Sequence, residues 1–487
     1  MCEIILNEEN TKQQLNSSKK ISVVVIGGGL SGLITSLKLS EKFNVTIIDK
    51  QKFLGGLATS INHNGYVMDI GPHILSLPTN SKILDTISMI MPKKELIELT
   101  NITNTSKAYF NNKLLNAFPT LSDTLYRSGK IFFIKILYEL FLTKIKNKYH
   151  TNYHSSKDYL ISCYGKNLYD SWFKPFLFSR FFSYDVPLDL IQNLFPPISL
   201  RKIVNSLFLN VKPRNLNLIS EEKSLHYYFE NGMISFIDEI QKKIKSNGGK
   251  FILDANIESI IHEKNKKIIL SVNDQKQEIP SNVIIYAVPP SITLKWFNPN
   301  NEIKQLIEKS TSHLHCIMTF LCINSPKLPF GWIINVYDEL VFFRITQQNF
   351  LSSSVTPNGK SLLCIEIKCS EESKIWNKSD SELFEIIKND LKKMDIFDVE
   401  MIEEFKVIKL KNLYPAGVSS TRKSDIILSK FFKSFSNEYV LGTIEGDTGR
   451  LSNISKDDTS DIGEGGITLA ISHADKLIKE IIGKHYS

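Results

Sequence analysis

The sequence predicts an α/β protein built around a parallel β-sheet. Its N-terminal region holds a continuous run of apolar, mostly β-branched residues at Ile21–Ile26, which is typical of a strand buried on both faces. A glycine-rich turn and a helical pattern follow, and Val45–Asp49 has the composition of a second strand. A strand, a helix and a strand within about 30 residues form a βαβ unit, which pairs its strands in parallel through a right-handed crossover.

The turn between the first strand and the helix has the spacing G-x-G-x-x-G, beginning at Gly27. Gly27 permits a tight turn, Gly29 leaves the backbone open to a pyrophosphate, and Gly32 lets the helix pack closely on the strand. The helix N-terminus adds free N–H groups and a partial positive charge, and Asp49 can accept hydrogen bonds from ribose hydroxyls. This context predicts a Rossmann-type dinucleotide site but does not distinguish NAD from FAD. The residues assigned to this site are Gly27, Gly29, Leu30, Ser31, Gly32, Asp49 and Lys50.

Similar α/β patterns recur later in the chain. Met233–Lys245 has one apolar helical face and ends at a glycine pair. The last helix is expected at Ile467–Ile482, again with one apolar face. Strand-like runs are found at Phe251–Ile261, Lys267–Val272, Val283–Val288 and Tyr439–Gly442.

The segments between these elements have other patterns. Residues from about 100 to 225 are mostly helical in pattern and rich in aromatics, whereas residues from about 312 to 370 alternate as strands do. This order predicts two interleaved domains rather than two consecutive ones. The predicted division is a flexible tail at 1–19, a discontinuous dinucleotide-binding domain at 20–100, 225–290 and 411–487, and an α+β substrate-binding domain at 101–224 and 291–410.

Further motifs follow the glycine turn. They are Leu54–Leu57, Met68–His73, Tyr164–Phe176, Tyr228–Phe236, Tyr286–Pro289 and Gly463–Ala470. As an ordered set they resemble the FAD-dependent amine oxidase superfamily, which includes protoporphyrinogen oxidase-like enzymes, phytoene desaturase-like enzymes and UDP-galactopyranose mutases. The resemblance covers most of the chain. It implies a Rossmann-type FAD-binding domain of the glutathione reductase-2-like type, interleaved with the α+β substrate domain.

The resemblance also implies roles for individual residues. Ile257 would contact the adenine through its backbone, and His73 would lie beside the isoalloxazine ring. Gly466 would open the last helix, whose dipole favours the negative charge of a reduced flavin. The residues placed around FAD beyond the glycine turn are Gly55, Gly56, Leu57, Gly71, Pro72, His73, Ile257, Gly466 and Ile467.

The implied activity is that of an FAD-dependent oxidoreductase, which transfers a hydride from a small organic substrate to flavin N5. His73 is the candidate catalytic residue, with a purely structural histidine as the alternative. A second hypothesis is a UDP-galactopyranose mutase-like, non-redox enzyme whose Arg344 and Arg450 bind the diphosphate of a nucleotide-sugar. For each arginine, a structural salt bridge is the competing interpretation.

The mutase hypothesis ranks second because Pro72 interrupts the GGH pattern typical of those enzymes. A third class, less favoured, is a non-catalytic binding protein of the GDP-dissociation-inhibitor type. Those proteins have lost much of the flavin-binding sequence, whereas the motifs at both ends of this chain look intact.

Composition argues against other classes. The net charge of +8, from 59 Lys+Arg and 51 Asp+Glu, is small for 487 residues and is scattered, so no nucleic-acid partner is expected. The six cysteines have no C-x-x-C spacing and no accompanying histidine cluster, so no metal site is expected. Their scatter through apolar segments suggests reduced thiols, and a cytoplasmic location is predicted.

No stretch reaches the roughly 18 apolar residues that a membrane span needs. The nearest, Ile131–Ile145, carries Lys135, Glu139 and Lys144, and is interpreted as a buried amphipathic helix. A membrane-surface helix is the less favoured alternative. A small-molecule substrate is therefore the expected partner, and the oligomeric state is left open.

Overall fold

The computed structural model contains a five-stranded parallel sheet with the strand order β10-β2-β1-β14-β20. The structure describes residues 20–78, 81–100, 106–110, 113–116, 131–132, 134–143, 153–181, 186, 188, 191–192, 195, 197, 224–310, 313–335, 340–415, 427, 430–441 and 466–486. The strands of this sheet are β1 (Ser22–Ile26), β2 (Asn44–Ile48), β10 (Lys250–Ile252), β14 (Val283–Tyr286) and β20 (Glu438–Val440). The parallel pairing of β1 with β2 confirms the predicted βαβ unit and the α/β class.

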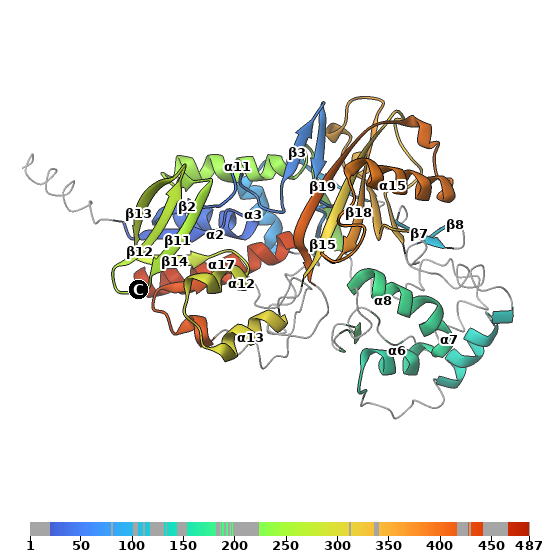
Figure 1. The fold of residues 1–487 in the computed structure, drawn as a ribbon, viewed down its shortest axis with the longest axis horizontal. Helices are drawn as coiled ribbons and strands as arrows, with labels where there is room; N and C mark the ends of the chain where they lie inside the picture. Colours follow the sequence, from blue (N-terminus) through green and yellow to red (C-terminus); the bar gives the residue numbers. More distant parts are fainter. Residues whose placement is uncertain are drawn as a thin grey trace, which may run out of the picture.

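Helices pack against one face of the parallel sheet. They are α2 (Leu30–Ser40), α3 (Lys82–Ile90), α11 (Met233–Ser246) and α17 (Gly466–Tyr486). α2 lies between α11 and α17 (Figure 1). Val23 and Val25 face these helices, whereas Val24 and Ile26 face the opposite side, so β1 is buried on both faces. The predicted apolar faces of α11 and α17 are buried in this layer, which confirms both helices.

The opposite face of the parallel sheet packs on a three-stranded antiparallel sheet and on short helices. These elements are β11 (Ala255–Ile261), β12 (Lys266–Val272), β13 (Gln275–Ser281), α12 (Pro290–Thr293), η4 (Leu294–Trp296) and α13 (Asn301–Ser310). The single strand predicted at Phe251–Ile261 is wrong. Asp254 has a φ of 55°, and the turn there separates β10 in one sheet from β11 in another.

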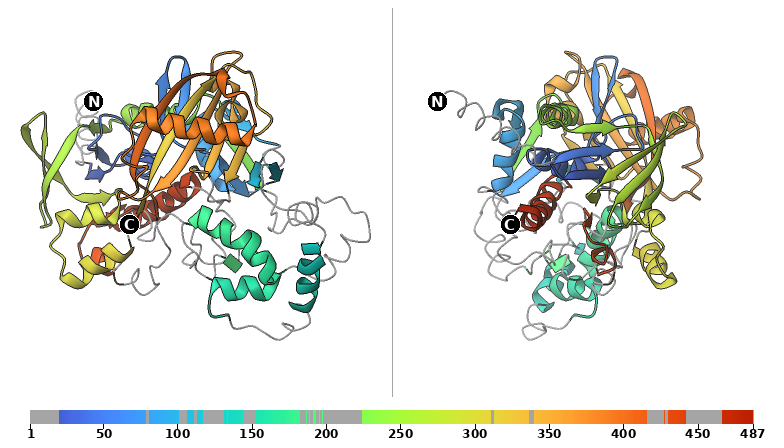
Figure 2. Two further views of the ribbon diagram at one scale, coloured as in Figure 1. Left: turned by 45° about the vertical axis from the view of Figure 1, so that its right-hand side comes forward. Right: turned by 90° about the vertical axis from the view of Figure 1, so that its left-hand side faces the viewer.

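A second large sheet has seven strands in the order β19-β15-β18-β17-β16-β7-β8. Its strands are β7 (Ser106–Phe110), β8 (Lys113–Asn116), β15 (His313–Ile323), β16 (Trp332–Asn335), β17 (Arg344–Gln347), β18 (Ser361–Cys369) and β19 (Ile402–Pro415). Helix α15 (Asp380–Met394) lies across one face (Figure 2). The hairpin of β3 (Ser60–His63) and β4 (Tyr66–Asp69) packs on the other face, where Met68 meets Met318 and Phe320.

Two details of this sheet differ from the sequence-based expectations. β7 and β8 lie in the stretch whose pattern predicted mostly helix, and they pair as a hairpin at the sheet edge. β19 continues to Pro415 and therefore crosses the domain boundary predicted between residues 410 and 411.

The remaining elements are short or helical. A helical cluster contains α6 (Ser156–Tyr164), α7 (Lys166–Leu168), the π-helix η2 (Tyr169–Phe173) and α8 (Lys174–Phe181). A small antiparallel sheet contains β5 (Leu75–Pro78), β9 (Ser224–Phe229) and β6 (Leu96–Glu98). Short elements occur at η1 (Lys93–Glu95), α14 (Gln348–Leu351), η5 (Ser353–Val355) and η6 (Val399–Met401). Within the described ranges, no helix is both long and apolar enough to cross a bilayer.

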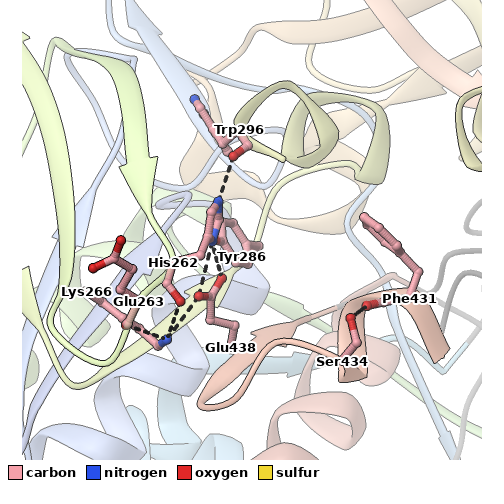
Figure 3. Close-up of polar contacts among 8 residues, drawn as sticks. All are labelled: His262, Glu263, Lys266, Tyr286, Trp296, Phe431, Ser434 and Glu438. Atoms are coloured by element: carbon pink, nitrogen blue, oxygen red, sulfur yellow. Dashed lines mark hydrogen bonds and ion pairs between the residues drawn. The ribbon is translucent and has the colours of Figure 1, made fainter. Parts of the chain in front are cut away.

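A buried polar cluster joins the parallel sheet to the three-stranded sheet (Figure 3). The Glu438 carboxylate, whose side chain is 1% exposed, lies 2.9 Å from His262 Nδ1 and 3.2 Å from Lys266 Nζ. It also accepts a hydrogen bond of 2.8 Å from the Tyr286 hydroxyl. The second ring nitrogen of His262 lies 2.7 Å from the Trp296 carbonyl oxygen. The cluster therefore provides partners for charges that burial alone would make unfavourable.

Candidate functional site

The glycine turn after β1 is shaped by contacts that leave no room for side chains. Gly27 has a φ of 111°, and a Cβ atom on it would lie 2.5 Å from the Ala287 carbonyl oxygen. A Cβ atom on Gly32 would lie 2.0 Å from the Gly27 carbonyl oxygen. Since real Cβ atoms do not approach other atoms this closely, only glycine allows α2 to start so near β1. The sequence assigned these two roles correctly.

Gly29 is different, because nothing in the described structure requires it to be glycine. Its φ and ψ are −69° and 174°, an extended conformation that any residue adopts. A Cβ atom on Gly29 would meet no atom within 4 Å. The space in front of Gly29 is therefore open, as it must be if a ligand is to contact the backbone at this point.

The N-terminus of α2 lies directly behind this open space. Gly29 is its N-cap, no side chain caps the helix there, and its first turn contains no acidic residue. The first N–H groups of a helix have no partner within the helix, and its dipole makes this end electropositive. The turn therefore offers N–H donors and a partial positive charge to an anion such as a pyrophosphate.

A second glycine pair lies on top of the first turn. The Gly55 N–H donates to the Gly28 carbonyl oxygen at 2.8 Å, and Gly29 and Gly55 form an isolated parallel bridge. Gly56 has a φ of 61°, and a Cβ atom on it would lie 3.1 Å from the Gly29 Cα atom. The structure thus brings together the two glycine motifs that the sequence assigned to one cofactor.

Asp49 is held at the carboxyl end of β2 with its carboxylate beside the turn. Its Oδ2 atom accepts a hydrogen bond of 2.6 Å from the Gly28 N–H, and its Oδ1 atom accepts one of 2.7 Å from the Gln51 N–H. Each oxygen keeps a further lone pair for a ligand hydroxyl. Lys50 is exposed beside it. This geometry fits the ribose contact predicted for Asp49.

The strand predicted to contact the adenine begins next to Asp49. The Ala255 N–H donates to the Asp49 carbonyl oxygen at 3.0 Å. Ile257 follows two residues later in β11, and its carbonyl oxygen accepts a hydrogen bond of 3.4 Å from Trp296 Nε1. Ile257 therefore lies near the ribose end of the site, and its contact with adenine stays a prediction.

His73 lies in the loop between β4 and β5 and has a buried, unpaired ring nitrogen. Among the described residues, its Nε2 atom has no hydrogen-bond partner. Burial lowers the pKa of His73, and the neighbouring Asp69 carboxylate and a hydrogen bond with the Leu57 backbone oppose this effect. The imidazole is therefore neutral near pH 7. A buried polar atom of this kind is normally satisfied, so Nε2 is a candidate contact for a water molecule or a bound ligand.

Asp69 is a buried carboxylate beside His73 that the sequence analysis did not single out, although it lies in the quoted Met68–His73 motif. It is buried and accepts hydrogen bonds from the Ser60 hydroxyl, from the Tyr228 hydroxyl at 2.5 Å and from the Met233 N–H at 3.1 Å. Burial raises the pKa of Asp69, while His73 and these donors oppose the increase. Asp69 thus fixes the start of α11 and the loop that carries His73.

Arg344 is paired with a buried glutamate. Its Nε and Nη2 atoms donate to the two carboxylate oxygens of Glu366 at 2.6 and 2.8 Å, and Glu366 is 0% exposed. The two residues face each other across β17 and β18. This geometry supports the salt-bridge interpretation of Arg344, because the guanidinium already has a bidentate anionic partner. The charges of both residues influence the pKa of His73, so the pair lies near it. Arg450 lies outside the described residues.

Helix α17 begins at Gly466, as the sequence predicted. Ile467 is buried in the core shared with the parallel sheet. The helix packs against β5, the strand that follows His73 directly. Its C-terminal end lies at the left of Figure 1, so its N-terminus points towards the seven-stranded sheet. The contact of Gly466 and Ile467 with the flavin ring stays a prediction.

These features fit a flavin dinucleotide. The bare backbone at Gly29 and the uncapped start of α2 suit its pyrophosphate, and Asp49 suits its ribose. The unpaired Nε2 atom of His73 suits a polar atom of its ring system. Gly71, Pro72 and Leu57 lie in the two loops that carry or contact His73.

Comparisons with known proteins agree with this geometry. Residues 25–88 match the family model of an NAD(P)-binding Rossmann-like domain. Coproporphyrinogen III oxidase of Staphylococcus aureus is 22% identical over 400 residues, which are 77% of this chain and 84% of that protein. Phytoene desaturase of Cercospora nicotianae is 41% identical over 64 residues, 13% of this chain and 10% of that protein.

Solved structures share the whole fold. Reduced UDP-galactopyranose mutase superposes with a TM-score of 0.75 at 15% identity, covering 94% of this chain and 96% of that one. A candidate protoporphyrinogen oxidase from Exiguobacterium sp. 255-15 has a TM-score of 0.70 at 14% identity, covering 96% of this chain and 99% of that one. Together with the sequence relatives, they confirm the resemblance predicted from the motifs. The chain is thus similar in sequence to coproporphyrinogen III oxidase and, over a short N-terminal stretch, to phytoene desaturase, and it shares the fold of these two solved structures.

Proposed function

We propose that the chain is an FAD-dependent oxidoreductase that removes a hydride from a small organic substrate. The observation that carries this proposal is the open space at Gly29, which is lined by two glycine motifs and backed by an uncapped helix. FAD, rather than NAD, is favoured because the chain has a candidate site for each part of a flavin dinucleotide, from Asp49 at the ribose to His73 at the ring. A bound flavin would supply an electron-pair acceptor at its N5 atom.

The residues of the chain would bind and orient the reactants. The N–H groups at the start of α2 would hold the diphosphate, and those of Gly466 and Ile467 would favour negative charge at the N1/O2 edge of the ring. His73, neutral near pH 7, could donate or accept one hydrogen bond through Nε2. Molecular oxygen or another electron acceptor would take the electrons in the second half of the reaction.

The proposal is tested first by cofactor binding. Purified protein should absorb as a flavoprotein and should retain FAD in preference to FMN and NAD. Gly29→Leu should abolish FAD retention by filling the open space while leaving the fold intact. Gly483→Leu in α17 is the matched control, because a Cβ atom there also meets no atom within 4 Å. Normal FAD occupancy in Gly29→Leu would contradict the assignment of the turn.

The substrate is tested next. Coproporphyrinogen III should be tried first, because the relative with that activity aligns with 77% of this chain, followed by amines and polyenes. The measured quantity is the rate of anaerobic bleaching of the bound flavin, with O2 uptake as a second readout. Turnover of UDP-galactopyranose only after reduction of the flavin, without net oxidation, would favour the mutase alternative instead.

The mutase alternative ranks second on a structural observation. Its proposed diphosphate ligand Arg344 is already held by both carboxylate oxygens of the buried Glu366. The fold shared with the reduced mutase does not decide between the two reactions, because one fold supports several chemistries.

A further inference from the structure

The helix at residues 131–143 carries an exposed apolar face. Residues 131–132 and 134–143 are helical, and this element, helix 131–143, lies at the outer edge of the helical cluster (Figure 2, turquoise). Large apolar side chains on it are 53–77% exposed, and they recur at spacings of three, four and three residues. They are Ile131, Ile134, Tyr138 and Phe141. Such spacing places them on one side of a helix. The expectation that this helix is buried is therefore wrong for this face.

The opposite face fixes the helix to the protein. Ile136 is 1% exposed and Leu140 is 3% exposed, and both pack in the core of the helical cluster with α6 and α8. The Glu139 carboxylate accepts a hydrogen bond of 2.8 Å from the Asn167 N–H. The exposed apolar side chains are thus presented outward by a helix whose inner face is already occupied.

The sequence in and next to this helix carries almost only positive charges. Between residues 127 and 150 the only acidic residue is Glu139, which the Asn167 N–H holds on the inner side. Lys135 is exposed on the helix itself, beside the apolar side chains. The basic residues of this stretch are Arg127, Lys130, Lys135, Lys144, Lys146 and Lys148.

We propose that helix 131–143 docks the protein on an anionic lipid surface, lying in the plane of the interface. Interfacial helices combine an apolar face with basic residues nearby in the sequence. The apolar face contacts the acyl chains, and the positive charges attract the anionic headgroups. A second copy of the chain is a poorer occupant, since symmetric pairing would bring two sets of positive charges together. The apolar side chains would enter only the headgroup boundary, since no described helix could span the bilayer.

The test is co-sedimentation of the full-length protein with lipid vesicles. Vesicles of phosphatidylcholine with about a third phosphatidylglycerol should bind the wild-type protein, and vesicles of phosphatidylcholine alone should bind it at least about tenfold less. The double variant Ile134→Ser/Phe141→Ser should lower the partition coefficient between vesicles and buffer by about tenfold or more, because it removes two apolar side chains that would enter the lipid interface. Raising the salt concentration should weaken binding of the wild-type protein.

The matched control is Met89→Ser, which removes an apolar side chain that is 77% exposed on α3, a helix far from helix 131–143 (Figure 1). This variant should bind vesicles as the wild-type protein does. Circular dichroism should show that both variants are folded, which is expected because the altered side chains are exposed. Failure of the wild-type protein to bind anionic vesicles, equal loss in Met89→Ser, or lipid-independent dimerisation that Ile134→Ser/Phe141→Ser abolishes would each overturn the proposal.

Discussion

Gly56 and Gly29 touch backbone to backbone, and a Cβ atom on Gly56 would lie only 3.1 Å from the Gly29 Cα atom. This contact means that the second glycine motif packs directly on the first one, while a Cβ atom on Gly29 itself would meet no atom within 4 Å. A side chain at position 56 would therefore press on the turn at Gly29.

Gly56→Ala should lower FAD affinity by about tenfold while the protein remains folded. The methyl group would shift Gly29 by a few tenths of an ångström, and a φ of 61° would add strain of about 1 kcal/mol. The measurements are the dissociation constant of FAD by fluorescence quenching and the free energy of unfolding of the apoprotein by urea titration.

The control for Gly56→Ala is Gly359→Ala. Gly359 has a φ of 77°, and a Cβ atom on it would meet nothing within 4 Å. Gly359→Ala should therefore lower the free energy of unfolding through similar backbone strain, but it should leave FAD affinity unchanged. Equal FAD affinity in both variants would mean that the contact between the two glycine motifs does not shape the site.

His73→Ala should keep FAD bound but slow reduction of the flavin by about a hundredfold, because one positioned hydrogen-bonding group is lost. Burial lowers the pKa of His73 below its usual value of 6.5, so the wild-type rate should not follow a histidine titration between about pH 7 and 8. His73→Asn should recover part of the rate by restoring a polar atom. The readout is stopped-flow bleaching with the substrate found by screening, and an unchanged rate in His73→Ala would assign this residue a structural role only.

Much of the dinucleotide site could be predicted from sequence because its determinants are local. Gly27, Gly29 and Gly32 act within one turn, and Asp49 follows the adjacent strand. Helix α17 was also predictable, since its apolar residues recur at helical spacing and its start coincides with Gly466.

The pairing of buried charges could not be predicted in this way. Asp69 accepts hydrogen bonds from Tyr228 and Met233, which lie more than 150 residues later in the sequence. No local sequence pattern links Asp69 with either residue. Glu366 lies in an apolar strand as a single acidic residue, which signals a buried pair but does not identify Arg344. The break at Asp254 was missed because the apolar pattern continues through it into a different sheet.

The Arg344–Glu366 pair should behave as a buried structural ion pair. Arg344→Met should destabilise the protein by about 3 kcal/mol or more, because it removes a bidentate positive partner of the buried Glu366 carboxylate. Arg344→Met/Glu366→Met should recover much of that loss, since no unpaired charge is left. The free energies of unfolding of the wild type, both single variants and the double variant form a double-mutant cycle. This cycle gives the interaction energy between Arg344 and Glu366 directly. A fully stable Arg344→Met variant with a raised KM for a phosphorylated substrate would instead support a ligand-binding role for this arginine.

The cluster around Glu438 should make stability depend on pH in a specific direction. Burial opposes the charged form of His262, but hydrogen bonds with Glu438 and the Trp296 carbonyl outweigh it and raise the pKa of His262 above 6.5. Burial likewise opposes ionisation of Glu438, but hydrogen bonds from His262 and Tyr286 lower its pKa below 4.5. The raised pKa of His262 contributes stability that is complete below pH 6.5 and is lost as pH rises through the folded-state value. The lowered pKa of Glu438 contributes stability that is present above pH 4.5 and is lost as pH falls.

His262→Gln should therefore cost more stability at about pH 5.5 than at about pH 8.5, with a loss of about 2 kcal/mol at the lower pH. The measurement is urea unfolding of the wild type and the variant at both pH values. Tyr286→Phe is the control, because it removes a 2.8 Å hydrogen bond to Glu438 from a group that stays neutral at both pH values. The loss of unfolding free energy in Tyr286→Phe should be the same at each pH. If His262→Gln also cost the same at each pH, His262 would be neutral in the folded protein, and the Glu438 charge would be balanced by Lys266 alone.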